Sequence, residues 1–295
     1  MNSTRSVTEI VPTHIVREGG GFKVRRPYRM GRVLSPFLLI DEMGPVDYGP
    51  GEALGAPWHP HRGFETVTYL LDGRMRHEDS AGNSGELNPG DVQWMTAGRG
   101  IIHCEEPHEE FLKTGGRTHG FQIWVNLPSS HKMMEPRYQE VPSTESPVVE
   151  KDGVWARVIA GECMGTTSSI DTKIPITLIH VKMKPESRLV QKLQEDLNGM
   201  IYVFGGGINL ENETRVKKSP IAFGIGAKQG IQDGELALLS EGEEIVIESQ
   251  EGAEFLIFAG PELNEPIERY GPFVMNTKEE IHQAFSDYQN GTFVN

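Results

Sequence analysis

Short apolar runs, each interrupted by glycine or proline, limit what this chain can fold into. The 295 residues include 34 glycines and 19 prolines, scattered along the whole length, and helical periodicity is scarce before the C-terminus. Within the runs, apolar and polar residues alternate, as they do in strands that bury one face. The pattern predicts an all-β protein, a sandwich or barrel of many short strands joined by tight turns.

Individual elements can be placed from the same signals. Residues 121–127 alternate cleanly, so Phe121, Ile123 and Val125 should face one way, and Pro128 should end the strand. Further strands are expected at residues 154–160, 177–183, 200–204, 244–248 and 255–259, and hairpin turns at residues 71–73, 80–83, 88–91 and 98–100.

One helix is predicted at the C-terminal end, over residues 277–288. Its apolar residues recur at helical spacing: Ile281, Ala284, Phe285 and Tyr288. Asn276 or Thr277 would cap the first turn, where two glutamates would also favour a helix N-terminus. The expected fold is therefore strands along most of the chain, followed by a short helix.

A polar stretch divides the chain. Residues 136–150 are mostly polar and contain three prolines, which is typical of a linker between domains. We therefore expect an N-terminal barrel over residues 1–135 and a C-terminal barrel over residues 151–295 that ends in the helix.

Net charge and cysteine content exclude several classes of function. The 28 Lys and Arg residues face 42 Asp and Glu residues, and the resulting formal charge of −14 gives no general attraction for nucleic acid. One basic cluster, residues 23–26 with Arg29, is expected on a solvated surface. Cys104 and Cys163 are too few for a disulfide framework, and no apolar segment suggests a signal peptide or a membrane span. We therefore expect a soluble protein of the cytoplasm and, in a eukaryote, also of the nucleus.

Two pairs of metal-binding residue types occur at spacing i, i+2. His59 and His61 form the first pair, and His103 and Glu105 form the second. Alternate residues of a strand point to the same face, so each pair would project together, and two neighbouring strands could bring all four to one point. Three imidazoles and a carboxylate suit Fe, Mn, Ni, Cu or Zn better than Mg or Ca. Four ligands leave up to two positions of an octahedral ion open to substrate or O₂.

Glu65 leaves the ligand set open. It has the same parity as His59 and His61, so it could add a fifth ligand or replace Glu105, unless Gly63 kinks the strand. We prefer Glu105 as the ligand and Glu65 as a nearby group, and either carboxylate could relay a proton during catalysis.

The other candidate ligands are assigned structural roles. Cys104 and Glu106 have the opposite parity to the second pair, so the thiol should pack in the core and the carboxylate should face away. His77 lies beside a predicted turn, where a hydrogen bond within the loop is expected. Histidines without a spaced partner are treated as ordinary: His108, His119 and His131.

A short internal match supports two similar halves. Residues 65–73 align with residues 198–206, with a tyrosine and a glycine in common. In this register Lys192 and Gln194 stand where the first pair of histidines stands. The C-terminal barrel is therefore expected to lack metal ligands.

Longer motifs carry a family resemblance. They lie at residues 36–45 (PFLLIDEMGP), 59–69 (HPHRGFETVTY), 77–80 (HEDS), 88–100 (NPGDVQWMTAGRG), 103–105 (HCE), 120–128 (GFQIWVNLP), 260–266 (GPELNEP) and 271–276 (GPFVMN). With these motifs, which cover nearly the full length, the chain resembles the pirin family of the cupin superfamily. Thr96 replaces the proline of the general cupin pattern, and extra residues precede His103, as in pirins.

The resemblance implies a fold, a metal and two possible roles. The fold would be two tandem cupin β-barrels of the jelly-roll type, with iron (Fe²⁺ or Fe³⁺, or another divalent transition metal) only in the N-terminal barrel. The family's ligands carry over onto His59, His61, His103 and Glu105. One implied role is cleavage of quercetin-like flavonols by O₂. The other is binding to transcription factors, controlled by the iron's redox state, without catalysis. A metal-stabilised scaffold is a third reading.

Overall fold

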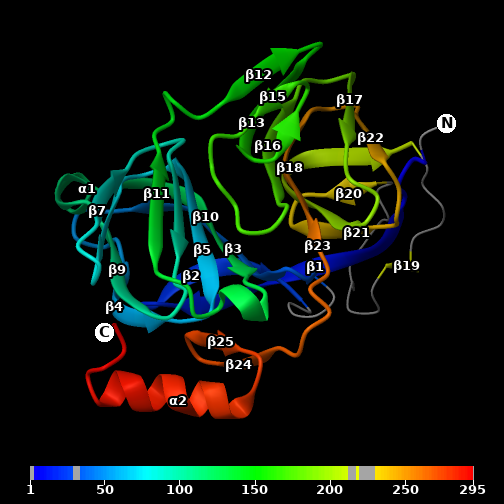
Figure 1. The fold of residues 1–295 in the computed structure, drawn as a ribbon. Helices are drawn as coiled ribbons and strands as arrows, with labels where there is room; N and C mark the ends of the chain where they lie inside the picture. The colour runs from blue at the N-terminus through cyan, green and yellow to red at the C-terminus, as the bar shows by residue number, and fades with distance from the viewer. Residues whose placement is uncertain (1–2, 29–33, 212–216, 219–229, 295) are drawn as a thin grey trace. The chain divides into compact units, whose positions relative to one another are not determined.

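The structure is a computed structural model that describes residues 3–28, 34–211, 217–218 and 230–294. Strands make up most of it, so the prediction of an all-β protein is confirmed (Figure 1). The described residues also contain the α-helices α1 (Glu109–Thr114) and α2 (Lys278–Gln289) and a 3₁₀ turn at Ser129–His131. Within the described residues, neither α-helix is long and apolar enough to span a lipid bilayer.

The chain divides into two compact units that are not contiguous in sequence. Unit 1 takes in the described residues of Met1–His14, Pro27–Arg29 and Ser146–Glu262. Unit 2 takes in those of Ile15–Arg26, Met30–Glu145 and Leu263–Asn295. Strand β1 (Val7–Glu18) begins in unit 1 and ends in unit 2.

This division differs from the expected domain boundaries. The stretch expected as a linker contains β11 (Arg137–Val141), which pairs with a strand of unit 2. All residues of β11 are half-buried, and a half-buried strand at the end of a sheet can be as polar as a linker. Helix α2 belongs to unit 2 and not to the C-terminal barrel.

Unit 2 is built from two antiparallel sheets. Their strands are β2 (Phe22–Pro27), β3 (Phe37–Tyr48), β4 (Ala56–His61), β5 (Phe64–Asp72), β6 (Met75–Asp79), β7 (Ser84–Leu87), β8 (Val92–Thr96), β9 (Ile101–Pro107), β10 (Gly116–Asn126) and β11. One sheet has the order β2–β3–β10–β5–β8–β11. The other has the order β4–β9–β6–β7. Side chains of β5 contact side chains of β4 and β9, so the two sheets face each other as a barrel.

The expected turns of this barrel are present, but three of the four are not hairpins. The turn at residues 80–83 joins β6 to its partner β7, as predicted. The turns after β5, β7 and β8 carry the chain from one sheet to the other. Local turn chemistry marks where a strand ends, but it does not tell which strand becomes the partner.

The C-terminal segment completes unit 2. It forms β24 (Glu268–Tyr270), β25 (Phe273–Met275) and α2, which begins one residue later than predicted. Thr277 is the N-cap, and its hydroxyl and the Glu280 side chain form a reciprocal capping box. The helix buries Ile281 and Ala284 in one cluster with side chains of β25.

Unit 1 is a second, mainly antiparallel β structure, and side chains fill its interior. Its further strands are β12 (Val148–Lys151), β13 (Val154–Ala160), β14 (Glu162–Cys163), β15 (Thr166–Thr167), β16 (Thr177–Met183), β17 (Ser187–Lys192), β18 (Leu197–Leu210), β19 (Lys217–Lys218), β20 (Ile231–Gln232), β21 (Glu235–Leu239), β22 (Glu244–Ser249) and β23 (Ala253–Pro261). Alternate residues of β13, β16, β18 and β23 join one continuous hydrophobic cluster.

Candidate metal centre

Strands β4 and β9 bring three of the predicted ligands together. They pair antiparallel, with His59 opposite His103 and His61 opposite Ile101. One ligand atom from each of the three histidines lies within 4.8 Å of the other two. The spacing i, i+2 within a strand and the register between strands therefore produce the cluster that the sequence predicted.

Backbone carbonyls orient two of the imidazoles. Nδ1 of His59 lies 2.7 Å from the carbonyl oxygen of Pro57, and Nδ1 of His61 lies 3.3 Å from that of Pro272. A carbonyl can only accept, so Nδ1 carries the hydrogen in both rings and Nε2 keeps its lone pair. This is the arrangement that usually supports a metal-binding histidine.

The positions of the three Nε2 atoms fit a transition-metal ion. The Nε2 atoms of His59 and His61 face each other at 3.0 Å, a distance at which two lone pairs repel. Two nitrogens held about 2.1 Å from one ion at a right angle would be about 3.0 Å apart. Nε2 of His103 is buried and has no hydrogen-bond partner within the described residues. A shared cation would satisfy all three atoms, and imidazole suits Fe, Ni, Cu and Zn.

Burial disfavours the charged form of two of these imidazoles, His61 and His103. Desolvation lowers the pKa of His61 well below its ordinary value, and the neighbouring His59 lowers it further. Desolvation also lowers the pKa of His103, together with the imidazoles around it. Neutral imidazoles can bind a metal ion without first losing a proton.

Glu105 lies beside the three imidazoles and not within their cluster. It follows His103 by two residues on β9, is largely buried, and lines the same cavity as His59. Its Oε1 accepts a hydrogen bond of 2.6 Å from the hydroxyl of Thr68 on β5. The structure thus holds this carboxylate close to the site, and its role as a fourth ligand stays a prediction.

The structure separates Glu65 from the imidazoles. Gly63, with φ of 89°, interrupts the chain between β4 and β5, so parity is not continuous across it. On β5, Phe64 and Thr68 face the site, which places Glu65 on the opposite face. Its Oε1 accepts a hydrogen bond of 2.6 Å from Thr96. This placement corrects the expectation that Glu65 shares a face with the first histidine pair.

His77 and Asp79 belong to the surroundings of the site, which the sequence reasoning missed. Strand β6 pairs with β9, with His77 opposite Glu105 and Asp79 opposite His103. Both side chains are fully buried, and Nδ1 of His77 lies 3.4 Å from Nδ1 of His103. His77 was expected to have a role in a loop, but it lies on strand β6 and is a neighbour of a candidate ligand. The signal was present, because His77 and Asp79 also have the spacing i, i+2.

The remaining candidates have the structural roles that were expected. Cys104 is packed in the core, and burial raises the pKa of its thiol. Glu106 points toward Arg76, with which it forms an ion pair of 2.8 Å. The three histidines without a spaced partner in the sequence lie elsewhere in unit 2: His108 caps α1, His119 contacts Glu42, and His131 contacts Ser130.

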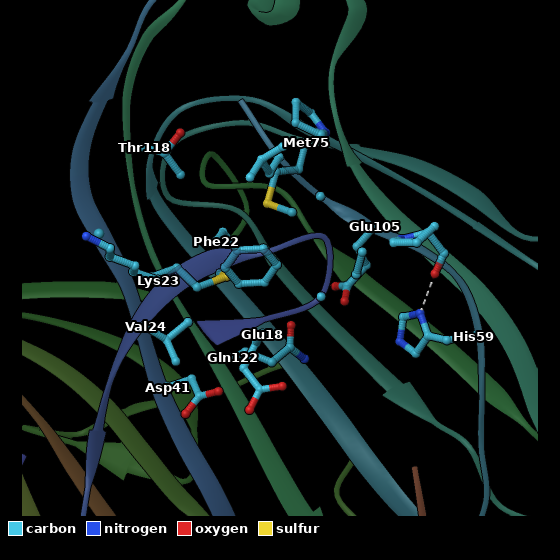
Figure 2. Close-up of a pocket in the computed structure, with 18 of the residues that line it drawn as sticks. Glu18, Phe22, Lys23, Val24, Asp41, His59, Met75, Glu105, Thr118 and Gln122 are labelled. Atoms are coloured by element: carbon cyan, nitrogen blue, oxygen red, sulfur yellow. Dashed lines mark hydrogen bonds between the residues drawn. The ribbon is translucent and has the colours of Figure 1, made fainter. Parts of the chain in front are cut away.

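A cavity of about 570 Å³ opens beside the imidazoles (Figure 2). Three neighbouring strands supply much of its wall through alternate residues: Phe22, Val24 and Arg26 of β2, Leu39, Asp41 and Met43 of β3, and Gln122 and Trp124 of β10. Figure 2 shows Glu105 and His59 at one side of the cavity and Asp41 at the other. The wall between them is largely apolar, with Phe22 and Met75 projecting inward.

The far side of the cavity is charged. Arg26 donates two hydrogen bonds of 2.6 Å to Asp41 and one of 2.6 Å to Glu18. Burial raises the pKa of Asp41, and the Arg26 guanidinium opposes that rise. Arg26 thus corrects the expectation that residues 23–26 form a solvated surface, while Arg29 lies outside the described residues.

A polar row links the two sides. Asp41 on β3 pairs with Gln122 on β10, and Gln122 pairs with Thr68 on β5. Neighbouring strands are about 4.8 Å apart, so the row spans roughly 10 Å from Asp41 to Thr68, which holds Glu105. A flat ligand of two or three rings could reach from the imidazoles to Asp41.

Comparison with known proteins gives consistent matches over the whole chain. The family model for Pirin matches residues 21–125, and that for the Pirin C-terminal cupin domain matches residues 178–294. Pirin from Homo sapiens is 41% identical over 98% of this chain and 94% of its own length. A candidate quercetin 2,3-dioxygenase of Pseudomonas aeruginosa is 38% identical over 99% of each chain. The crystal structure of quercetin 2,3-dioxygenase from Acinetobacter baumannii matches with a TM-score of 0.89 and 35% identity, covering 99% of each chain.

Proposed function

Because this chain belongs to the pirin family of two-barrel cupin proteins, we propose that it is an iron-dependent dioxygenase that cleaves quercetin-type flavonols with O₂. The observation that carries the proposal is the convergence of three imidazoles at one side of a largely apolar cavity. A volume of about 570 Å³ lies in the range of small-molecule sites. The quercetin 2,3-dioxygenase with 35% identity supports the same reaction class.

The metal would be held by His59, His61 and His103 through Nε2, with Glu105 as the fourth ligand. Iron suits this mixed nitrogen and oxygen set, and other divalent transition metals also fit it. When bound, the ion would supply Lewis acidity toward a flavonol oxygen and the redox chemistry that O₂ requires. The residues of this chain would bind the substrate, orient it and accept its proton.

Glu105 is the proposed proton acceptor. It is the carboxylate on the imidazole side of the cavity, whereas Glu65 lies on the other face of β5. A flavonol bound against the imidazoles would place its ring hydroxyl beside this carboxylate, which could take the proton. The hydrogen bond from Thr68 would hold Glu105 in place during the transfer.

The cavity wall would orient the substrate and exclude water. Phe22 and Trp124 offer apolar surfaces to aromatic rings, and Asp41 on the far side can accept hydrogen bonds from phenolic hydroxyls. Because Asp41 and Glu105 lie at opposite sides, a flavonol with hydroxyls at both ends would be held with its long axis between them.

A second candidate function is an iron-dependent regulator that binds protein partners such as transcription factors. Three apolar side chains that line the cavity are also exposed: Val46 at 36%, Leu54 at 48% and Trp58 at 52%. Trp58 directly precedes the candidate ligand His59, so a change in the ligands of the metal would move an exposed aromatic side chain. A partner protein that binds these three exposed side chains would then respond to the state of the metal.

One experiment separates the two candidates. The protein is purified without O₂, analysed for metals, loaded with Fe²⁺ and mixed with quercetin while O₂ consumption and flavonol absorbance are recorded. We expect O₂-dependent loss of the absorbance, abolished by a chelator and by His103→Ala. If the iron-loaded protein consumes no O₂ with any flavonol tested, the dioxygenase proposal fails and the regulator becomes the better account.

A further inference from the structure

A buried histidine–carboxylate pair stands behind one of the candidate ligands. Nδ1 of His77 lies 3.4 Å from Nδ1 of His103, and Nε2 of His77 lies 3.3 Å from Oδ2 of Asp79. We propose that His77 and Asp79 form a relay that fixes the tautomer of His103 and strengthens its electron donation to the metal. The inference rests on the proposed metal site and names two positioning residues for it.

The hydrogen positions follow from the acceptor at the end of the relay. Asp79 accepts hydrogen bonds from the backbone N–H groups of Ala81 and Asn83 and from the Asn83 side chain, at 2.8–2.9 Å. The carboxylate oxygens of Asp79 accept in each of these bonds, so Nε2 of His77 carries the hydrogen of the bond to Oδ2. In the tautomer with its one hydrogen on Nε2, His77 accepts at Nδ1.

This assignment continues to the metal side. Because Nδ1 of His77 accepts, Nδ1 of His103 must donate to it, and Nε2 of His103 keeps its lone pair. That Nε2 atom is the buried nitrogen without a hydrogen-bond partner within the described residues. The chain of three groups therefore selects the only tautomer in which His103 can bind a metal through Nε2.

Packing holds the relay in one geometry. The His77 ring stacks on Tyr138, with centroids 5.0 Å apart and planes at 25°. The Tyr138 hydroxyl is itself fixed, because it donates to Glu140 at 2.5 Å and accepts from Gln93 at 3.2 Å. His77 and Asp79 also lie on one strand that is paired along its length with β9. The relay is thus built from two adjacent strands and a stacked ring.

A carboxylate two hydrogen bonds away makes the ligating imidazole a stronger donor. The effect stabilises the more highly charged ion more strongly, so it should favour Fe³⁺ over Fe²⁺. Losing the relay should weaken binding of both ions and raise the reduction potential of the site. Hydrogen-bonded partners of metal-bound histidines typically contribute about 10–100-fold to metal affinity.

Two substitutions at His77 distinguish a relay from a packing role. His77→Phe keeps an aromatic ring to stack on Tyr138 but removes both hydrogen bonds. His77→Gln loses the ring but can accept from His103 through its amide oxygen and donate to Asp79 through its amide nitrogen. The dissociation constant for Fe²⁺, measured anaerobically by chelator competition, and the reduction potential of the iron-loaded protein are the readouts.

We expect His77→Phe to weaken Fe²⁺ binding about 10–100-fold and to raise the potential. The Fe²⁺ dissociation constant of His77→Gln should stay within about threefold of the wild-type value, because both hydrogen bonds of the relay can still form. If His77 only packs, the order reverses, with the Phe variant near the wild type and the Gln variant weaker, and the relay is overturned. Asp79→Asn is an independent variant. Its amide would present a donor to Nε2 of His77, so the hydrogen of that ring would move to Nδ1. Fe²⁺ binding should therefore weaken in this variant too.

A matched control comes from unit 1. His180 is also buried, bonds a carboxylate (Oε1 of Glu254 at 3.0 Å) and contacts the aromatic rings of Trp155 and Phe204. His180→Phe should leave the Fe²⁺ dissociation constant unchanged. Wild-type protein that binds no Fe²⁺ would overturn the proposed function together with the relay. Wild-type protein that binds Fe²⁺ no better than a correctly folded His77→Phe variant would overturn the relay alone.

Discussion

The interiors of the two units differ more than their strands do. Unit 1 fills its interior with one continuous cluster of aliphatic side chains from β13, β16, β18 and β23. Unit 2 has strands of similar length, but its interior holds three imidazoles, a row of polar side chains and a cavity. The same type of β structure can therefore enclose either a packed apolar core or a polar site. The residues that face inward decide which of the two it encloses.

One aligned pair of positions shows the difference at the level of single residues. The internal match places Thr68 of β5 over Ile201 of β18, and both belong to central strands. Ile201 is part of the aliphatic cluster, whereas the Thr68 hydroxyl bonds Glu105 and Gln122. A buried polar group is tolerated only when it has partners. Unit 2 meets this condition by pairing its polar residues across neighbouring strands.

The largest expected effect removes a ligand from unit 2. His103→Ala should lower Fe²⁺ affinity by more than about 100-fold, because a direct ligand contributes more than the outer-shell groups that support it. Elemental analysis after dialysis against a weak chelator measures the effect. His180→Ala in unit 1 is the control and should keep its metal. Full metal content in His103→Ala would remove His103 from the ligand set.

The next effect tests the filled interior of unit 1. Ile201→Thr replaces a core side chain by the residue type found at the aligned position, but without polar partners nearby in its aliphatic cluster. The free energy of unfolding should fall by about 2–4 kcal/mol, from lost apolar burial and an unpaired hydroxyl. Denaturant titration of the metal-free protein measures this, and Fe²⁺ affinity should not change. A loss below about 0.5 kcal/mol would mean that the interior of unit 1 is less closely packed than the structure shows.

The reciprocal substitution tests the polar row of unit 2. Thr68→Val keeps the shape of the side chain and removes the hydroxyl that donates to Glu105. If Glu105 is a metal ligand, losing this support should weaken Fe²⁺ binding about tenfold. Thr8→Val is a suitable control, since Thr8 is exposed and its hydroxyl donates to the Leu238 carbonyl of unit 1. Unchanged affinity in Thr68→Val would argue against a metal ligand role for Glu105 that depends on the Thr68 hydroxyl.

Features that depend on local periodicity could be predicted from the sequence. The alternation at Phe121, Ile123 and Val125 identified β10, in which all three side chains are fully buried. The helical stripe and its cap identified α2. The pairs at spacing i, i+2 identified the three imidazoles, because strand geometry converts that spacing directly into a shared face.

Features that depend on pairing between distant segments could not be predicted. The face of Glu65 depends on the backbone at Gly63, where a positive φ interrupts the strand and parity is lost. The burial of Arg26 depends on Asp41, which only the pairing of β2 with β3 brings near. His77 was assigned to a loop because it lies beside a predicted turn, whereas strand β9, with which its own strand pairs, follows more than twenty residues later in the chain. In each case a residue was judged by its sequence neighbours, whereas its role is decided by neighbours in space.

The smallest expected effect concerns the buried cationic side chains, one in each unit. In unit 1, Arg5 donates to the backbone carbonyls of Gly242 and Leu197. In unit 2, Lys132 donates from Nζ to the carbonyls of Gly63 and Val274 and to the Asn126 side chain. Both side chains are almost fully buried. They differ in chemistry, because arginine stays charged at any pH tolerated by proteins, whereas a buried lysine can release its proton.

Desolvation lowers the pKa of Lys132 from 10.5 to about 8 in the folded protein. Between these values the unfolded chain binds more protons than the folded protein, so the free energy of unfolding rises with pH in this window. The contribution of Lys132 should be about 1 kcal/mol between pH 8 and pH 9. Denaturant titrations of metal-free wild type and Lys132→Met at both pH values isolate it, since the variant lacks the titrating group. Equal pH dependence in the two proteins would show that Lys132 stays charged in the folded state, and the cation of unit 2 would then act as Arg5 does in unit 1.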